Sequence, residues 1–397
     1  MKTELVVQID EPWQKESVEE IARRFEVLNP GVKIIVKVVP NGEIRTTLYT
    51  GESNADLVQL FNGDIVDCSK DGLLLDLRTW LRQNHELENL FHPSIFRLIQ
   101  PDGRVAVLPL SASMKGIFYN KQWFDKAGIP YPEEDWTWND FMEIAIRLQR
   151  ANVHKEEGFA ARISFHREYI GLLLLTAGTD WLSPDKRRAS GYANNAQAVQ
   201  AVQWAVDLVR KHQVARATQE YFANSDLIRN EVGMILDYYV MLHEIQPHLK
   251  EDLGVAGLPQ FIDGHRVNEP WVCGFGISSK TINPKLAWSF LCEMTCTNNE
   301  LTRLVSEGSI APLRSVYSEV SHDSDPLRNA ILAELENSAQ LPVSSGNTAL
   351  YSLLDDYVNP ALARIVFEGA DVKGTLDDLA IVLDGKLQDH FSTPLLS

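Results

Sequence analysis

Aromatic and acidic side chains follow three short apolar segments of the chain, and residues of these types together can hold a polyhydroxylated ring. Flat aromatic faces pack against the apolar C–H faces of such a ring, while carboxylates and amides accept hydrogen bonds from its hydroxyl groups. Structural interpretations stay open, because Trp13 could cover the end of a sheet and Asp10 and Glu11 could be solvated loop charges. The candidate residues are Asp10, Glu11 and Trp13 after "ELVVQI", Phe61, Asn62 and Asp64 after "ADLVQL", and Asp237, Tyr238 and Tyr239 after "VGMIL".

The apolar segments are predicted strands, since they are short and alternate with amphipathic helices. In "SVEEIARRFEVL", Val18, Ile21 and Phe25 fall at helical spacing, and Ser17 with Glu20 predicts a capping box. The order strand, helix, strand, helix, strand is typical of a parallel sheet. Ligands of open α/β sheets bind at the carboxyl ends of the strands, where the candidate residues are placed.

A second α/β unit is predicted to begin at "GIFYN", a strand followed by the short helix "KQWFDKAG". Trp136 and Trp138 precede the next helix and are expected to pack in a core. Tyr238 and Tyr239 are adjacent, so in an extended backbone they point to opposite sides and only one is expected to face a ligand. The remaining expected elements are a helix over 73–84, the strand "GRVAVLPL", helices over 168–177 and 195–213, the strands "GVAGLP" and "VCGFGIS", and helices from 284 onward.

Composition limits the possible functions. The chain has 397 residues, of which 45% are hydrophobic, enough for two cores. Its net charge of −17 argues against a nucleic-acid partner, because phosphate binding needs clustered Lys and Arg. No apolar run reaches the ~18 residues that would span a bilayer. The start "MKTELVVQID" lacks the apolar core of a signal peptide, which fits either a cytoplasmic protein or a mature form.

No metal or cofactor is expected. The sequence has no CxxC, and in "HEIQPH" a proline between His243 and His248 spoils a helical metal pair. The "GFGISS" segment lacks the third glycine and the following helix of a dinucleotide-binding loop. The cysteines, which are expected to be buried and unreactive unless two of them form a disulfide, are Cys68, Cys273, Cys292 and Cys296.

No catalytic residue is assigned, because the motifs GxxxxGK[ST], HExxH and GxSxG are all missing. A glycosidase would need two carboxylates with separated pKa values. Asp10, Asp64 and Asp237 could supply them, but so could carboxylates of any acidic chain. A carbohydrate-active enzyme therefore stays an alternative, which turnover of sugars would reveal.

The order of segments resembles the extracellular solute-binding proteins of ABC importers, in the sugar-binding family that includes the maltose-binding proteins. Each matching segment is weakly specific alone, and their common order over nearly the whole chain is highly specific. They are "SVEEIARRFEVLNPGVKI", "ADLVQL", "DGLLLDL", "FYNKQWFDKAGI", "WTWNDFMEIAIRL", "TAG", "VGMIL", "VAGLP", "GFGISSKTINPKLAWSFLCEMT" and "SEGSIAPLRS".

The resemblance implies the type II periplasmic-binding-protein fold, in which two α/β lobes are joined by a hinge and the ligand lies in the cleft between them. The expected division is residues 1–112 and 276–313 for the N-terminal lobe and 113–275 and 314–397 for the C-terminal lobe, with hinge crossings near 111–114, 271–275 and 312–316.

The resemblance also adds positions to the predicted site. Ser113 stands where the family's best-known member has a sugar-contacting carboxylate, which weakens any carry-over of that member's sugar preference. The segment before "TAG" usually faces the cleft, which nominates His166, Glu168 and Tyr169. The segment before "GFGIS" nominates Trp271, and packing stays an alternative for it.

The implied function is that of a substrate-binding protein, which captures a sugar or oligosaccharide and delivers it to ABC permease subunits in the membrane. A sensor receptor of the same fold is the alternative, and genes for permease subunits beside this one would distinguish the two. The protein is expected to be a monomer in the periplasm or lipid-anchored at the cell surface, with its signal segment absent from this sequence. An acidic sugar would suit the site if Lys115, His166, Arg167 and Arg314 faced the cleft.

Overall fold

The computed structural model divides into two compact units, each described by itself. Unit 1 comprises Met1–Ser113, Trp271–Pro326 and Ser345–Thr348, and unit 2 comprises Met114–Pro270, Leu327–Ser344 and Ala349–Ser397. The structure describes residues 2–397 apart from 41, 85, 101–102, 152–157, 223, 262, 320–326, 328–330, 332–333, 336–347 and 393–397.

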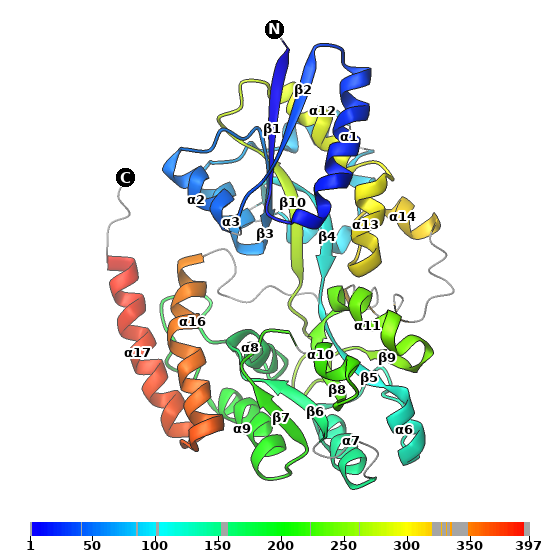
Figure 1. The fold of residues 1–397 in the computed structure, drawn as a ribbon. Coiled ribbons are helices and arrows are strands. Elements are labelled where there is room, and N and C mark those ends of the chain that lie inside the picture. Colours follow the sequence, from blue (N-terminus) through cyan, green and yellow to red (C-terminus); the bar gives the residue numbers. More distant parts are fainter. Residues whose placement is uncertain are drawn as a thin grey trace. The chain divides into compact units, whose positions relative to one another are not determined.

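Unit 1 is built on a five-stranded sheet in the order β2-β1-β3-β10-β4 (Figure 1). β1 pairs in parallel with β2 and β3, whereas β10 pairs antiparallel with β3 and β4. The strands are β1 (Thr3–Ile9), β2 (Val32–Val38), β3 (Leu57–Phe61), β4 (Val107–Ser113) and β10 (Trp271–Ile277). The helices are α1 (Lys15–Leu28), α2 (Glu43–Thr50), α3 (Asn62–Lys70), α4 (Arg78–Gln83), α5 (Pro93–Leu98), α12 (Pro284–Thr295), α13 (Glu300–Gly308) and α14 (Arg314–Glu319).

Unit 2 has a second five-stranded sheet, in the order β7-β6-β8-β5-β9. β6 is parallel to β7 and β8, and β5 is antiparallel to β8. The strands are β5 (Lys115–Asn120), β6 (Phe159–Ser164), β7 (Ala215–Thr218), β8 (Val232–Tyr238) and β9 (Leu253–Ala256). The helices are α6 (Lys121–Ala127), α7 (Trp138–Ala151), α8 (Arg167–Thr176), α9 (Ala196–Arg210), α10 (Asn224–Ile228), α11 (Leu242–Leu249), α16 (Thr348–Ala363) and α17 (Val372–Ser392).

Several predicted elements need correction. The capping box is wrong, because α1 begins two residues before Ser17, at Lys15, and its N-cap Gln14 makes no side-chain cap bond. The helix expected over 73–84 covers only Arg78–Gln83, since Leu74 instead bridges to Ser278. The parallel sheet of unit 1 also includes the antiparallel strand β10.

The predicted packing role of the two tryptophans agrees with their burial. Trp138 is buried and donates from Nε1 to Thr176 Oγ1 at 2.9 Å. Trp136 is buried as well and donates to the carbonyl oxygen of Gly257 at 2.9 Å. Gly128 ends α6, with a φ of 62° that favours glycine.

The division into units differs from the predicted lobes at four places, because unit 1 also takes in Ser113, 271–275, 314–326 and 345–348. Residues 271–275 group with unit 1, because the whole strand Trp271–Ile277 pairs with β3 and β4. Residues 314–326 also group with unit 1. The hinge crossings and the cleft between lobes stay predictions.

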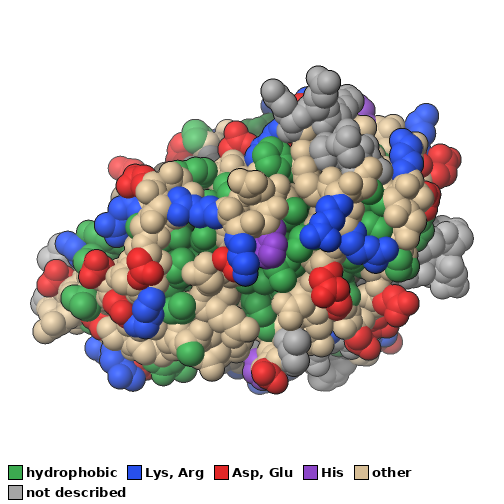
Figure 2. Space-filling model, turned by 90° about the horizontal axis from the view of Figure 1, so that it is seen from below, with side chains coloured by type: hydrophobic (Ala, Val, Ile, Leu, Met, Phe, Trp, Pro, Cys, Tyr) green, Lys and Arg blue, Asp and Glu red, His purple; other side chains and the backbone are tan. Residues whose placement is uncertain are grey.

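Charged side chains of both signs are mixed on the face drawn in Figure 2, where Lys and Arg lie among Asp and Glu. Within the described part of the chain, no helix has the length and apolar character that crossing a membrane requires.

Candidate functional site

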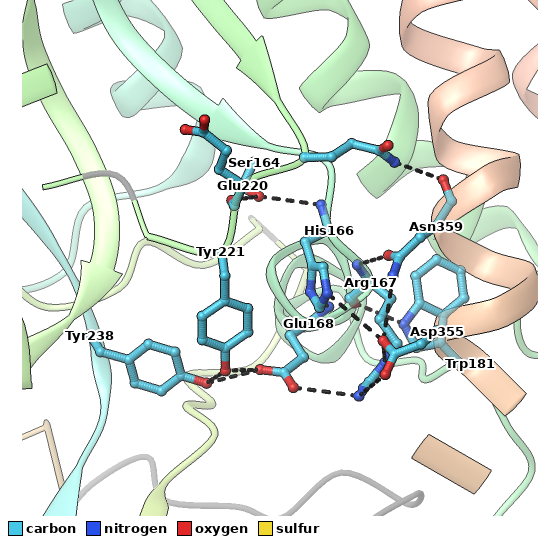
Figure 3. A network of polar contacts seen from close by, with 11 residues as sticks. Ser164, His166, Arg167, Glu168, Trp181, Glu220, Tyr221, Tyr238, Asp355 and Asn359 are labelled. Carbon is cyan, nitrogen blue, oxygen red and sulfur yellow. Dashed lines mark hydrogen bonds and ion pairs between the residues drawn. The ribbon is translucent and has the colours of Figure 1, made fainter. Parts of the chain in front are cut away.

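Glu168 is the centre of a polar network in unit 2, shown in Figure 3. Its Oε2 accepts hydrogen bonds from the hydroxyls of Tyr221 at 2.5 Å and Tyr238 at 3.0 Å. The two tyrosine rings are stacked, with centroids 5.8 Å apart. Arg167 approaches the other carboxylate oxygen at 3.4 Å. The sequence-predicted residues Glu168 and Tyr238 are therefore brought together, from α8 and from the end of β8.

Lys115, on β5, lies next to this network and is fully buried. Its Nζ is 3.1 Å from Glu269 Oε2, and it lies 4.2 Å above the ring centroid of Tyr238. The attraction between the ammonium and the ring adds to the ion pair. Asn268 fixes the lysine backbone, because its side-chain amide accepts from Lys115 N at 3.2 Å and donates to Lys115 O at 2.6 Å.

The two carboxylates beside Lys115 have pKa values shifted in opposite directions. Burial alone would raise the pKa of Glu168, but the charges of Lys115 and Arg167 with the Tyr221 hydrogen bond lower it overall. Burial raises the pKa of Glu269, and the charge of Glu168 adds to this rise while Lys115 opposes it. A lysine shared by two buried acids therefore keeps Glu168 ionised.

The first turn of α8 positions the candidate residues on one side of Glu168. His166 is the N-cap residue, and its Nδ1 accepts from Glu168 N at 3.4 Å. Burial lowers the pKa of His166 below its usual value. Arg167 donates from Nε to Asp355 at 2.5 Å and lies over the ring of Tyr351, so α16 also contributes to the network.

Asp237 and the tyrosines around it are buried more deeply. Tyr169 donates to Asp237 Oδ1 at 3.2 Å, and the same oxygen accepts from Tyr238 N at 2.8 Å. Tyr239 points away from this network, since its ring packs against Phe118. The predicted opposite orientation of the adjacent tyrosines thus agrees with their contacts, and only Tyr238 joins Glu168.

In unit 1, Asp10 follows β1 and lies beside Gln59 of β3. Asp10 N donates to Gln59 Oε1 at 3.3 Å, and Gln59 Nε2 donates to Gln14 Oε1 at 2.9 Å. Asp10 Oδ1 is buried and has no hydrogen-bond partner among the described residues. Burial, with the charges of Glu11 and Asp64, raises the pKa of Asp10 to about 7. This carboxyl therefore lies in a low-dielectric setting and can take a hydrogen bond from a ligand.

An aromatic pair lies where β3 ends and the neighbouring strand β10 begins in the same unit. The rings of Phe61 and Trp271 are stacked, with centroids 4.7 Å apart and an angle of 24° between their planes. Asn62 holds β10 in place, because its Oδ1 accepts from Val272 N at 2.6 Å. Ser113 is buried and pairs with Trp271 in the β4–β10 ladder.

The other sequence-predicted residues of unit 1 are more exposed. Trp13 is 51% exposed and donates from Nε1 to Glu11. Burial raises the pKa of Glu11, and the bond from Trp13 opposes that rise. Asp64 is ion-paired with Arg45 at 3.2 Å. Whether any of these residues touches a ligand stays a prediction.

The cysteines are free thiols. Cys68 and Cys273 are buried, and Cys292 and Cys296 are partly buried. Burial raises the pKa of Cys68 to about 12, which makes it a poor nucleophile at neutral pH. The disulfide alternative is not found, and within the described ranges no group of three or more His, Cys, Asp and Glu residues is placed to hold a metal ion.

Sequence reasoning missed several members of the unit 2 network. Tyr221, Glu269 and Asp355 were not nominated, although they contact Glu168, Lys115 and Arg167 respectively. The spacing of Tyr221 and Tyr238 gives no local signal. The proline that follows Glu269 and the tryptophan after it could have marked a chain segment entering β10 beside the site.

The amino-acid sequence is similar to those of known binding proteins. Residues 10–295 match the family described as bacterial extracellular solute-binding protein. A binding protein of Brucella abortus (strain 2308) is 32% identical over 124 residues, which are 30% of this chain and 29% of that protein. The multiple sugar-binding protein of Streptococcus mutans is 27% identical over 147 residues, 36% of this chain and 32% of that protein. The matches thus span about a third of these relatives' lengths.

Solved structures show the same fold. The substrate-binding protein Lmo0181 of Listeria monocytogenes, in complex with cycloalternan, has a TM-score of 0.78 at 18% identity, covering 99% of this chain and 100% of that chain. The sugar-binding protein MalE of Xanthomonas citri has a TM-score of 0.79 at 16% identity, covering 98% of each chain. The type II periplasmic-binding-protein fold predicted from the sequence is therefore confirmed.

Proposed function

Because the chain belongs to the family of bacterial extracellular solute-binding proteins, we propose that it binds a saccharide and delivers it to the permease of an ABC importer. Family membership implies an extracytoplasmic location. The curated relative from Streptococcus mutans is named a multiple sugar-binding protein, and the Listeria neighbour is in complex with cycloalternan.

The observation that carries the proposal is the cluster of Glu168, Tyr221 and Tyr238. A carboxylate with two tyrosine hydroxyls on one of its oxygens offers hydrogen-bonding groups next to flat rings. This combination fits the hydroxyl groups and the C–H faces of a sugar. The stacked pair of Phe61 and Trp271 offers a second aromatic surface in unit 1.

The protein acts by binding alone in this proposal. The family and the structural neighbours are binding proteins. Glu168 is kept ionised by its neighbours, which suits a hydrogen-bond acceptor and not a general acid. We therefore expect the saccharide to leave the protein chemically intact. As a separate expectation, the protein acts as a monomer.

A thermal-shift screen against a broad panel of mono- and oligosaccharides tests the proposal. A ligand at about 100 times its dissociation constant should stabilise the protein by ~2.7 kcal/mol. Hits are confirmed by calorimetry, and chromatography of the recovered sugar tests whether it stays intact. If no saccharide stabilises the protein, or if the sugar returns cleaved, the proposed function is wrong.

Matched variants connect the binding to the site. Tyr221→Phe and Tyr238→Phe each remove one hydroxyl from Glu168 and should weaken binding of the identified sugar. Tyr131→Phe is the control, because Tyr131 is 40% exposed and its hydroxyl donates to Asp125 Oδ1 at 2.7 Å, away from Glu168. Equal affinity in all three variants would place the sugar elsewhere.

A further inference from the structure

The tyrosine hydroxyls at Glu168 have no hydrogen left to offer a ligand. Tyr221 and Tyr238 both direct their hydrogen bonds to Glu168 Oε2, and their oxygens are 3.1 Å from each other. A phenol has a single hydrogen, so each of these oxygens can only accept a further bond. The cluster is therefore rich in acceptors.

The cations of the cluster are engaged by carboxylates. Lys115 Nζ pairs with Glu269 at 3.1 Å. Arg167 pairs with Asp355 at 2.5 Å and reaches Glu168 at 3.4 Å. The remaining basic group is His166, and burial lowers its pKa, which favours the neutral form. An anionic sugar would have to compete with these carboxylates for each cation.

The charges around Glu168 also disfavour an anionic ligand. The two cations Lys115 and Arg167 are engaged by three carboxylates, Glu168, Asp355 and Glu269. The side chain of Glu168 is only 15% exposed, so an anion brought to it would meet a like charge that is poorly screened by water, which is costly.

We propose that the ligand is a saccharide that donates hydrogen bonds to the acceptors of the Glu168 cluster in unit 2, with an amino sugar in its ammonium form bound most tightly and acidic sugars rejected. The inference rests on the proposed saccharide function and names the chemical class within it. It also argues against the acidic ligand that the sequence positions of His166, Arg167 and Lys115 allowed.

Matched sugars test the proposal by calorimetry at slightly acidic pH, where the amines are protonated. The sets are glucosamine, glucose and glucuronate, their galactose counterparts, and oligosaccharides of glucosamine, glucose and glucuronate. Within a set that binds, we expect the amino sugar to bind about tenfold more tightly than the neutral one, and the acidic sugar at least about tenfold more weakly.

The outcomes separate this inference from the function it rests on. An acidic sugar that binds as tightly as its neutral counterpart overturns the inference and leaves the saccharide function standing. A neutral sugar that binds more tightly than its amino counterpart also overturns it. If no member of any set binds, the saccharide function itself fails, and the inference fails with it.

A charge variant tests the cause. Asp355→Asn removes the carboxylate that pairs with Arg167, so the affinity for the acidic sugar relative to the affinity for the neutral sugar should rise severalfold. Asp207→Asn is the matched control on α9, where Asp207 pairs with Lys211 at 3.7 Å. The same ratio of acidic to neutral affinity in both variants would refute the role of charge, and misfolding would appear as loss of neutral binding. If Asp355→Asn misfolds, the affinities of the parent protein for the amino, neutral and acidic sugars still decide the proposal.

Discussion

Replacing Lys115 by Met tests whether the buried lysine is needed to offset two acids. The ammonium is fully buried, 3.1 Å from Glu269 and 4.2 Å above the ring of Tyr238. Met keeps most of the side-chain length but has no charge. Lys115→Met therefore leaves Glu269 buried without its cation and removes one of the charges that keep Glu168 ionised.

Breaking a buried ion pair by removing one partner costs ~3–5 kcal/mol of unfolding free energy. For a unit of this size, that corresponds to a fall of about 6–20 °C in melting temperature. The loss should be largest at neutral and alkaline pH. The pKa of Glu269 is already raised in the folded protein, and without Lys115 it rises further. A raised folded pKa contributes stability that is lost as pH rises through it, so protonation at acidic pH offsets part of the damage.

The effect of the Lys115→Met substitution on Glu168 is also larger at neutral pH than at acidic pH. Its folded pKa is lowered by Lys115 and Arg167, so it stabilises the protein above its unfolded pKa. The variant lacks part of that contribution at neutral pH, and the deficit shrinks as pH falls through the folded pKa.

Thermal and urea unfolding of the parent and the variant, at about pH 5 and about pH 8, measure the effect. Lys211→Met is the control, because Lys211 is 67% exposed and its pair with Asp207 is at the surface. It should change stability by less than about 0.5 kcal/mol. Adding Glu269→Gln to Lys115→Met should recover about 0.5–3 kcal/mol relative to the sum of the single variants. A Lys115→Met loss as small as the control's, or one that is equal at both pH values, would refute the reasoning.

Three further predictions concern other parts of the molecule. Trp138→Ala should cost ~3–5 kcal/mol in urea unfolding because the ring is buried, whereas the half-exposed Trp13 should be replaceable by Ala at almost no cost; similar losses would contradict the packing assignment. Asp10→Asn should gain stability relative to the parent from about pH 4 to about pH 7 and then stay level, because the parent loses stability as pH rises towards its raised pKa; melting curves over pH that stay parallel would exclude this. Trp271→Ala should weaken binding of the identified sugar by roughly ten- to a hundredfold in calorimetry, and an unchanged affinity would remove the aromatic pair from the site.

The sequence allowed most strands and helices to be placed because apolar runs and turn residues mark them. β6 was missed because Arg162 interrupts its apolar run "FAARIS". That arginine is buried, and it pairs with Asp226 at 3.3 Å and with Glu220 at 2.5 Å. A charge inside a central strand is stabilised only by partners distant in sequence, which no local pattern shows.

Some residues of the candidate site could be predicted from the sequence, but their partners distant in sequence could not. Glu168 and His166 could be nominated because they precede the "TAG" segment, and Tyr238 because it ends a strand. Glu269 is separated from Lys115 by 154 residues, and Asp355 from Arg167 by 188. Contacts between segments so far apart are set by the sheet order and by the packing of α16, so they become visible only in the folded chain.

The position of Lys115 gives its pairing a second consequence. The chain passes from unit 1 to unit 2 between Ser113 and Met114 and returns between Pro270 and Trp271. Lys115 and Glu269 lie next to these two passages and are ion-paired, and Asn268 binds the lysine backbone on both sides. The ion pair therefore joins the two connecting segments within unit 2. The charge of Lys115 also lowers the pKa of Glu168, so Lys115→Met should alter sugar affinity as well as stability if the sugar binds at Glu168, and calorimetry with the identified sugar measures this.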